Sequence, residues 1–177
     1  YKKWYFGLKD VFNPVKFNPS EWADIMQDAG MKYMVFTTKH HDGFCMYDSK
    51  YTDFSIAKHA FKDNPKRDVA RWVFDAFRQK GMWVGCYFSK PDWHSEWFWT
   101  PHYATPDRRP NYKLDRHPEC WLSFKEFTKK QLTELTTDYG ALDILWLDGG
   151  WVKGDDIDLD EVLRGARQRH PGLICVD

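Results

Sequence analysis

The feature that most constrains the fold of this chain is a repeated order of segments, in which a helix-like run is followed within a few residues by a short apolar run. The apolar runs are MKYMVFTT (31–38), MWVGCYFS (82–89), ALDILWLD (141–148) and GLICVD (172–177). The helix-like runs before them cover about residues 18–30, 64–81, 121–140 and 156–170. Continuous apolar runs of this length are typical of parallel strands covered by helices. The pattern therefore predicts an α/β fold with about four parallel strands.

Two of the predicted helices share a start signal. Asn18 followed by Pro19, and Asn64 followed by Pro65, place a capping side chain before a proline that fits the first helical turn. Apolar residues at helical spacing follow each start. Trp22 is one of them, and the spacing predicts that it packs against its neighbours rather than contacting a ligand.

The segments after the first two predicted strands, residues 39–63 and 90–118, are long. Long loops at the carboxyl ends of parallel strands are where α/β proteins build active sites. No G-x-G-x-x-G or G-x-x-x-x-G-K-S/T sequence follows a predicted strand, which argues against a dinucleotide or P-loop fold. The leading prediction is part of a (β/α)8, TIM-like barrel.

Four strands of such a barrel would leave strand edges unpaired. The chain also begins without an initiator Met. We therefore expect residues 1–177 to be one partial domain of such a barrel, completed by missing flanking segments or by a partner.

Composition and residue spacing argue against several classes of protein. Lys plus Arg and Asp plus Glu both number 26, and no basic stripe is present, which argues against a nucleic-acid partner. No apolar run approaches the roughly 18 residues of a membrane span. The four cysteines, Cys45, Cys86, Cys120 and Cys175, show no C-x-x-C spacing, so buried free thiols are expected rather than a metal site or disulfides.

Aromatic residues make up 18% of the chain, and ten of them are Trp. Trp fills cores, but it also suits sugar-binding clefts because it combines an apolar face with an N–H donor. The loop from Pro91 to Pro118 contains Trp93, Trp97 and Trp99. This loop is expected to form a cleft wall.

Polar and aromatic side chains stand at the carboxyl ends of the predicted strands: His40 and His41, Tyr87 and Ser89, Trp146 and Asp148, and Asp177. Alternation along a strand places Trp146 and Asp148 on one face, so these groups are expected to converge. Asp148 has two interpretations. It could form a covalent intermediate or accept a proton, or it could cap a turn, which D-G-G sequences favour.

The adjacent histidines of KHHDGF allow three interpretations. A metal-dependent barrel hydrolase would use His40, His41, His94 and Asp148, although adjacent residues chelate one ion poorly. A second interpretation is two loop histidines with no chemical role. Binding of sugar hydroxyls fits best, because imidazoles offer both N–H donors and acceptor nitrogens.

The sequence KHHDGFCMYDSKYTDF, preceded by EWADIMQDAGMKYMVFTT, resembles the signature region of glycoside hydrolase family 29, the retaining α-L-fucosidases. The runs KRDVARWVFDAFRQKGMWVGCYFS and LDILWLDGGW follow in the order of that family. The resemblance implies that residues 1–177 are a partial (β/α)8-like glycosidase catalytic domain, without the first strand and the C-terminal part of the barrel. It implies that the nucleophile matches Asp148. It also implies that His40 and His41 bind fucose hydroxyls and that Tyr87 and Trp146 line the same subsite.

Trp93 and Trp151 are expected to pack against the sugar face or its methyl group. The resemblance implies an exo-acting enzyme that acts on fucosylated oligosaccharides or glycoconjugates, needs no metal or organic cofactor, and works in a secreted, periplasmic or lysosomal setting. The general acid/base is expected outside these residues, and Asp92, Glu96 and Asp177 are weaker candidates for that role. Besides the metal-dependent hydrolase, the alternative interpretation is a catalytically inactive fucose-binding module.

Overall fold

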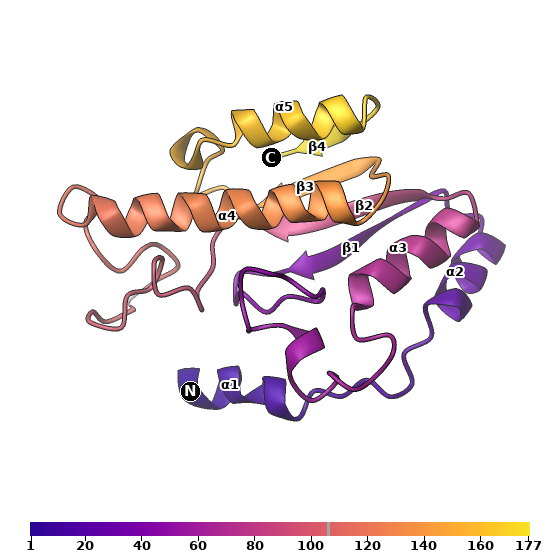
Figure 1. The fold of residues 1–177 in the computed structure, drawn as a ribbon, viewed down its shortest axis with the longest axis horizontal. Helices are drawn as coiled ribbons and strands as arrows, with labels where there is room; N and C mark the ends of the chain where they lie inside the picture. The colour runs from indigo at the N-terminus through magenta and orange to yellow at the C-terminus, as the bar shows by residue number, and fades with distance from the viewer. Residues whose placement is uncertain (106) are drawn as a thin grey trace.

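A four-stranded parallel sheet, in the order β1-β2-β3-β4, forms the centre of the computed structural model, which describes residues 1–105 and 107–177 (Figure 1). The strands are β1 (Tyr33–Lys39), β2 (Trp83–Ser89), β3 (Ile144–Asp148) and β4 (Ile174–Val176). The helices are α1 (Lys2–Gly7), α2 (Pro19–Asp28), α3 (Val69–Gln79), α4 (Pro118–Asp138) and α5 (Asp160–Arg169). Short 3-10 turns cover Leu8–Asp10, Ile56–Lys58 and Asp155–Ile157. The predicted alternation of helix and parallel strand is confirmed, whereas α1 had no counterpart in the prediction.

The two faces of the sheet differ in burial. The helix-covered face carries Cys86, Phe88 and Leu145, which are all buried. The opposite face carries large side chains that are about half exposed, among them Trp83 and Trp146. Because side chains alternate along a strand, Trp146 and Asp148 share this second face, as the sequence predicted.

The second predicted helix begins later than its Asn-Pro signal indicated. Asp68 caps α3, because its side chain accepts a hydrogen bond from the Arg71 N–H. The Asn64 side chain accepts from Lys66 N at 2.8 Å instead. The prediction of a start at Asn64 is wrong because a carboxylate directly before the amphipathic run competes successfully as the cap.

The apolar side of α2, which was predicted to pack, is largely exposed. Trp22 and Ile25 are 44% and 60% exposed, whereas the fully buried residue is Ala23. Trp22 packs edge-to-face on Phe17, with ring centroids 5.3 Å apart, so its predicted packing role is confirmed only locally. This side of α2 and Val73 of α3 line an apolar groove of about 710 Å³.

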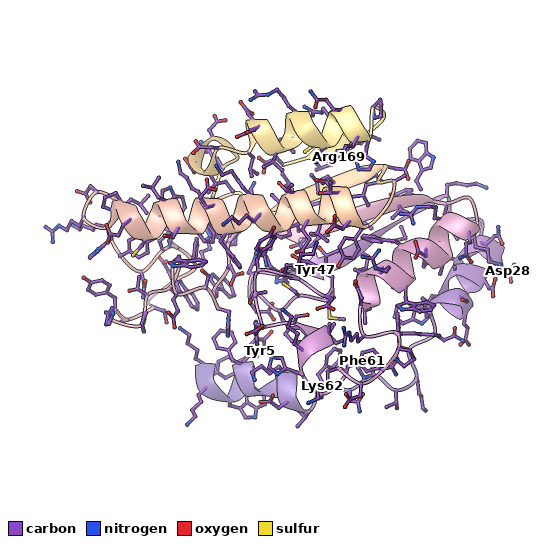
Figure 2. All side chains as sticks on the ribbon, in the orientation of Figure 1. Tyr5, Asp28, Tyr47, Phe61, Lys62 and Arg169 are labelled. Carbon is purple, nitrogen blue, oxygen red and sulfur yellow. The ribbon has the colours of Figure 1, made fainter. Side chains whose placement is uncertain are left out.

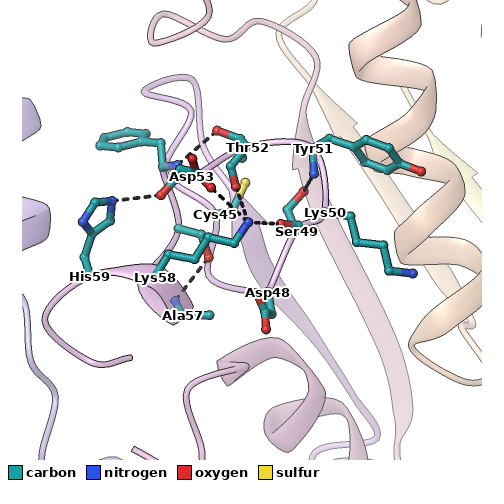
Figure 3. Close-up of polar contacts among 12 residues, drawn as sticks. Cys45, Asp48, Ser49, Lys50, Tyr51, Thr52, Asp53, Ala57, Lys58 and His59 are labelled. Carbon is teal, nitrogen blue, oxygen red and sulfur yellow. Dashed lines mark hydrogen bonds and ion pairs between the residues drawn. The ribbon is translucent and has the colours of Figure 1, made fainter. Parts of the chain in front are cut away.

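The loop between β1 and α3 is held together by polar contacts (Figure 3). Lys58 Nζ donates to the carbonyl oxygens of Ser49 and Thr52 at 2.7 and 3.0 Å, and to Asp53 Oδ1 at 3.3 Å. Glu134 of α4 accepts a hydrogen bond from Ser49 Oγ at 3.0 Å. These bonds fix the loop to the helix layer.

The hydrophobic core includes two side chains from the loop between β1 and α3, Tyr47 and Phe61, which are at most 1% exposed (Figure 2). All four cysteines are free thiols, as predicted. Only Cys45 and Cys86 are buried, so the predicted burial is wrong for the other two. None of the helices in the described ranges is long and apolar enough to cross a membrane.

Candidate active site

The carboxyl ends of β1, β2 and β3 bring the candidate residues to one edge of the sheet. Tyr87 of β2 pairs in register with Trp146 of β3, and Ser89 pairs with Asp148. His40 and His41 follow directly after β1. Parallel strands end at a common edge, so three separate strand ends supply one cluster of side chains.

Asp148 is the centre of this cluster. Tyr87 Oη donates to Asp148 Oδ2 at 2.5 Å, and the Gly149 N–H donates to Oδ1 at 2.5 Å. His41 Nε2 lies 3.8 Å from Oδ2. The hydrogen bond from Tyr87, helped by the Gly149 N–H and the nearby histidines, lowers the pKa of Asp148 although partial burial opposes this. The side chain is therefore a carboxylate at neutral pH.

His41 is buried, whereas its neighbour His40 is exposed. Burial, and then the charge of His40, lower the pKa of His41, so its imidazole is neutral near pH 7. His41 Nδ1 forms a short hydrogen bond with Ser89 Oγ, and that hydroxyl donates to Pro91 O at 3.1 Å. Ser89 therefore accepts from Nδ1–H, which leaves Nε2 as the acceptor atom of the neutral ring.

Aromatic rings surround the histidine pair. His40 stacks on Tyr87 with centroids 5.8 Å apart and an interplanar angle of 3°. The His41 ring lies 5.4 Å from Trp93 and 4.8 Å from Trp151. The cluster thus unites Asp148, His40, His41, Tyr87, Trp93 and Trp151. Trp146 stands beside them as the register partner of Tyr87, with 44% of its surface exposed.

A buried ion pair connects the end of β1 with the loop that follows β2. Lys39 Nζ is 3.2 Å from Asp92 Oδ2, and the two side chains are 0% and 2% exposed. Lys39 also donates to Gln131 Oε1 of α4 at 3.2 Å. Asp92 Oδ1 accepts from the N–H groups of His94 and Ser95. Both oxygens of Asp92 are engaged, so this geometry does not favour Asp92 as a general acid/base.

The remaining contacts concern the four proposed metal ligands and Asp177, a candidate general acid/base. Ligand atoms of His40, His41 and Asp148 lie within 4.8 Å of one another. His94, the fourth proposed ligand, is outside this group and stacks on Phe54 with centroids 3.9 Å apart. Asp177 forms an ion pair with Lys90, a residue that is 1% exposed.

The sequence model of the α-L-fucosidase family matches residues 1–177. The chain belongs to the α-L-fucosidase family. It is 35% identical over 148 residues to Alpha-L-fucosidase 1 of Arabidopsis thaliana, an alignment that covers 82% of this chain and 24% of that protein. The chain therefore spans about a quarter of that relative.

Solved fucosidases share its fold. The structure of the family 29 enzyme of Bacteroides thetaiotaomicron is 32% identical with a TM-score of 0.80, covering 98% of this chain and 37% of the other. Another structure of a family 29 α-L-fucosidase from the same organism captures a covalent intermediate with 2-fluoro-fucosyl fluoride; it is 29% identical with a TM-score of 0.78, covering 98% of this chain and 37% of the other. The fucosidase of Thermotoga maritima, with a mechanism-based inhibitor, is 35% identical with a TM-score of 0.77, covering 98% and 38%. These matches confirm the predicted fold, part of a (β/α)8 barrel.

Several contacts of this family member had little signal in the sequence. The pairing of Lys39 with Asp92 spans 53 positions, and the bond between His41 and Ser89 spans 48. The sequence alone favours an exposed position for Lys39, because a fully buried lysine is rare unless it is paired. A lysine directly after an apolar strand was the one available hint.

Proposed function

We propose that the protein containing this chain removes terminal α-L-fucosyl residues from oligosaccharides or glycoconjugates with retention of configuration. The observation that carries the proposal is the state of Asp148, a carboxylate that receives two 2.5 Å hydrogen bonds and lies 3.8 Å from His41 Nε2. Such bonds hold the carboxylate in one orientation and keep it ionised, as a nucleophile requires. A family relative with a captured covalent intermediate supports the same chemistry.

In this mechanism an Asp148 oxygen attacks the anomeric carbon and displaces the glycosidic oxygen. A carboxylic acid about 5 to 5.5 Å away, supplied from outside residues 1–177, protonates that oxygen as the bond breaks. The same group then removes a proton from water, which attacks the glycosyl–Asp148 ester and releases fucose. Two displacements at one carbon give net retention.

The histidine pair orients the sugar in this proposal. The acceptor Nε2 of His41 takes a hydrogen bond from a fucose hydroxyl close to the nucleophile, and the exposed ring of His40 offers a second polar edge. Bonds that strengthen as the sugar ring flattens toward an oxocarbenium ion lower the barrier. Trp93, Trp146 and Trp151 supply apolar surface for the sugar face or its methyl group.

The test is release of nitrophenol from an aryl α-L-fucoside by the complete protein and by Asp148→Ala. Turnover that disappears in the variant supports the proposal. Turnover that persists at the wild-type rate in Asp148→Ala would refute the assignment of the nucleophile.

Two other functions are distinguished by related measurements. Folded wild type that binds fucose saturably by calorimetry without turnover would instead indicate a sugar-binding module. Among the residues that the structure describes, the grouping of His40, His41 and Asp148 favours a metal-dependent hydrolase. Activity abolished by a chelator and restored by zinc would support that alternative.

A further inference from the structure

A cavity of about 470 Å³ adjoins the Asp148 cluster. One wall comes from α1, through Tyr5 and Phe6, and the other from the loop after β2, through Trp93 and Trp99. His40 lines this cavity and also stacks on Tyr87, so it is shared between the cavity and the cluster. A ligand that occupies the cluster can therefore continue past His40 into the cavity.

The two tryptophans of the cavity are held in a fixed orientation. Their rings are nearly parallel, with centroids 5.1 Å apart and an interplanar angle of 5°. The indole N–H of Trp93 donates to Arg108 O at 3.2 Å, and that of Trp99 donates to Arg109 O at 2.9 Å. Because consecutive carbonyls of one loop engage both donors, the tryptophans present ring surface rather than N–H groups to a ligand.

The opposite wall supplies polar groups. Tyr5 Oη donates to Asp42 Oδ2 at 2.6 Å, which ties α1 to the loop that carries the histidines. Lys2 Nζ lies 5.0 Å from the ring centroid of Trp99 and 5.8 Å from that of Phe6. Lys2 is exposed, and a lysine side chain has rotational freedom, so its ammonium can move aside and donate to hydroxyl groups of a ligand.

We propose that this cavity binds the leaving-group sugar of a fucosylated saccharide, with the sugar ring packed on Trp99 and its hydroxyls contacting Lys2 and Asp42. The proposal rests on the fucosidase function proposed above and extends it to the second sugar. A neutral pyranose fits this chemistry, because it has an apolar C–H face for an aromatic ring and a polar rim for charged side chains. Trp99 is then a specificity residue, since it contacts the part of the substrate that leaves.

The experiment compares two substrates of the complete protein. One is the best substrate among α1,2-, α1,3-, α1,4- and α1,6-linked fucosyl disaccharides, and the other is α-L-fucosyl fluoride, whose leaving group is a single atom. The variant is Trp99→Ala, and the matched control is Trp72→Ala, a 41% exposed tryptophan on α3. If the alanine variant does not fold, Trp99→Leu keeps apolar volume without the ring.

The expected result is a fall of about tenfold in kcat/KM for the disaccharide in the Trp99 variant, the factor that about 1.4 kcal/mol of lost stacking produces. The fluoride should change less than about twofold, and Trp72→Ala should leave both substrates unaffected. Equal losses on both substrates, or no loss on the disaccharide, would overturn the leaving-group site while the fucosidase function stands. A wild type that hydrolyses neither substrate would overturn the fucosidase function, and the site with it.

Discussion

Tyr87 on β2 donates a 2.5 Å hydrogen bond to Asp148 Oδ2 at the end of the neighbouring strand β3. This bond crosses between strands whose sequence positions differ by 61. Burial and the bond to Asp148 raise the pKa of Tyr87, so the phenol keeps its proton and remains a donor. The same bond is the largest cause of the lowered pKa of Asp148.

Tyr87→Phe tests this relationship. Removing the donor destabilises the ionised carboxylate and therefore raises the pKa of Asp148. A hydrogen bond to a charged group contributes roughly 1.5 to 3 kcal/mol, so the acid limb of the kcat/KM profile should move up by about one to two pH units. Tyr103→Phe, which alters a hydroxyl bonded to His117 instead, is the control and should leave the profile in place. An unmoved acid limb in Tyr87→Phe would contradict the role assigned to the bond.

Gly149→Ala is expected to damage the site, whereas Gly150→Ala is expected to be tolerated. Gly149 has φ +93°, and a Cβ atom there would lie 2.2 Å from Pro91 Cδ. Nothing lies within 4 Å of a Cβ at Gly150. Strain and overpacking should cost about 2 to 4 kcal/mol at Gly149 and displace the adjacent Asp148, seen as a lower free energy of unfolding and lower kcat. Equal effects of the two substitutions on unfolding and kcat would contradict a specific role for the tight packing of Gly149 against Pro91.

The buried pair of Lys39 and Asp92 predicts strong coupling. Lys39→Met leaves an unpaired buried carboxylate and should lower the free energy of unfolding by about 3 to 5 kcal/mol. The double variant Lys39→Met with Asp92→Asn removes both charges and keeps an acceptor for the His94 and Ser95 N–H groups, so it should recover part of the loss. Urea unfolding measures both. A double variant less stable than Lys39→Met would argue against the coupling.

His41 predicts a pH dependence of stability. Its folded-state pKa is lowered by burial, so below about pH 6.5 the unfolded chain takes up a proton that the folded chain does not. The stabilisation that neutral His41 contributes to the free energy of unfolding is fully present above about pH 6.5. It is lost as the pH falls toward the folded-state pKa, by at most about 1.4 kcal/mol per pH unit. Urea unfolding of His41→Gln between pH 5 and 8 should show a shallower decline than the wild type. Identical slopes would mean that His41 does not titrate differently in the two states.

The sequence predicted the strands well because their apolar runs are long and continuous. Asp148, His40, His41 and Tyr87 could also be placed together, since parallel strands end at one edge. Helix starts were less certain: Asn18 does cap α2, but Asp68 replaced Asn64 at α3. Local signals of similar strength compete there, and only the packed structure decides between them.

The remaining parts of the site depend on contacts between distant segments. The short α1 has no strong helical pattern, yet Tyr5 reaches Asp42 across 37 positions and helps to form the cavity beside His40. Trp22 shows the converse, because its helical spacing predicted packing and yet 44% of its surface is exposed. Periodicity states which face of a helix is apolar, but not whether another element covers it.

Labelling of the complete protein with 2-deoxy-2-fluoro-fucosyl fluoride tests directly whether Asp148 is the nucleophile. This compound should form the glycosyl–enzyme faster than water releases it. Intact-mass spectrometry should then show one added 2-fluoro-fucosyl group per chain, and peptide mapping should place it on Asp148. Asp148→Ala, tested in parallel, should gain no mass. Stable labelling of a different residue, or turnover of the fluoride with no covalent species in the wild type at any time, would contradict Asp148 as the nucleophile.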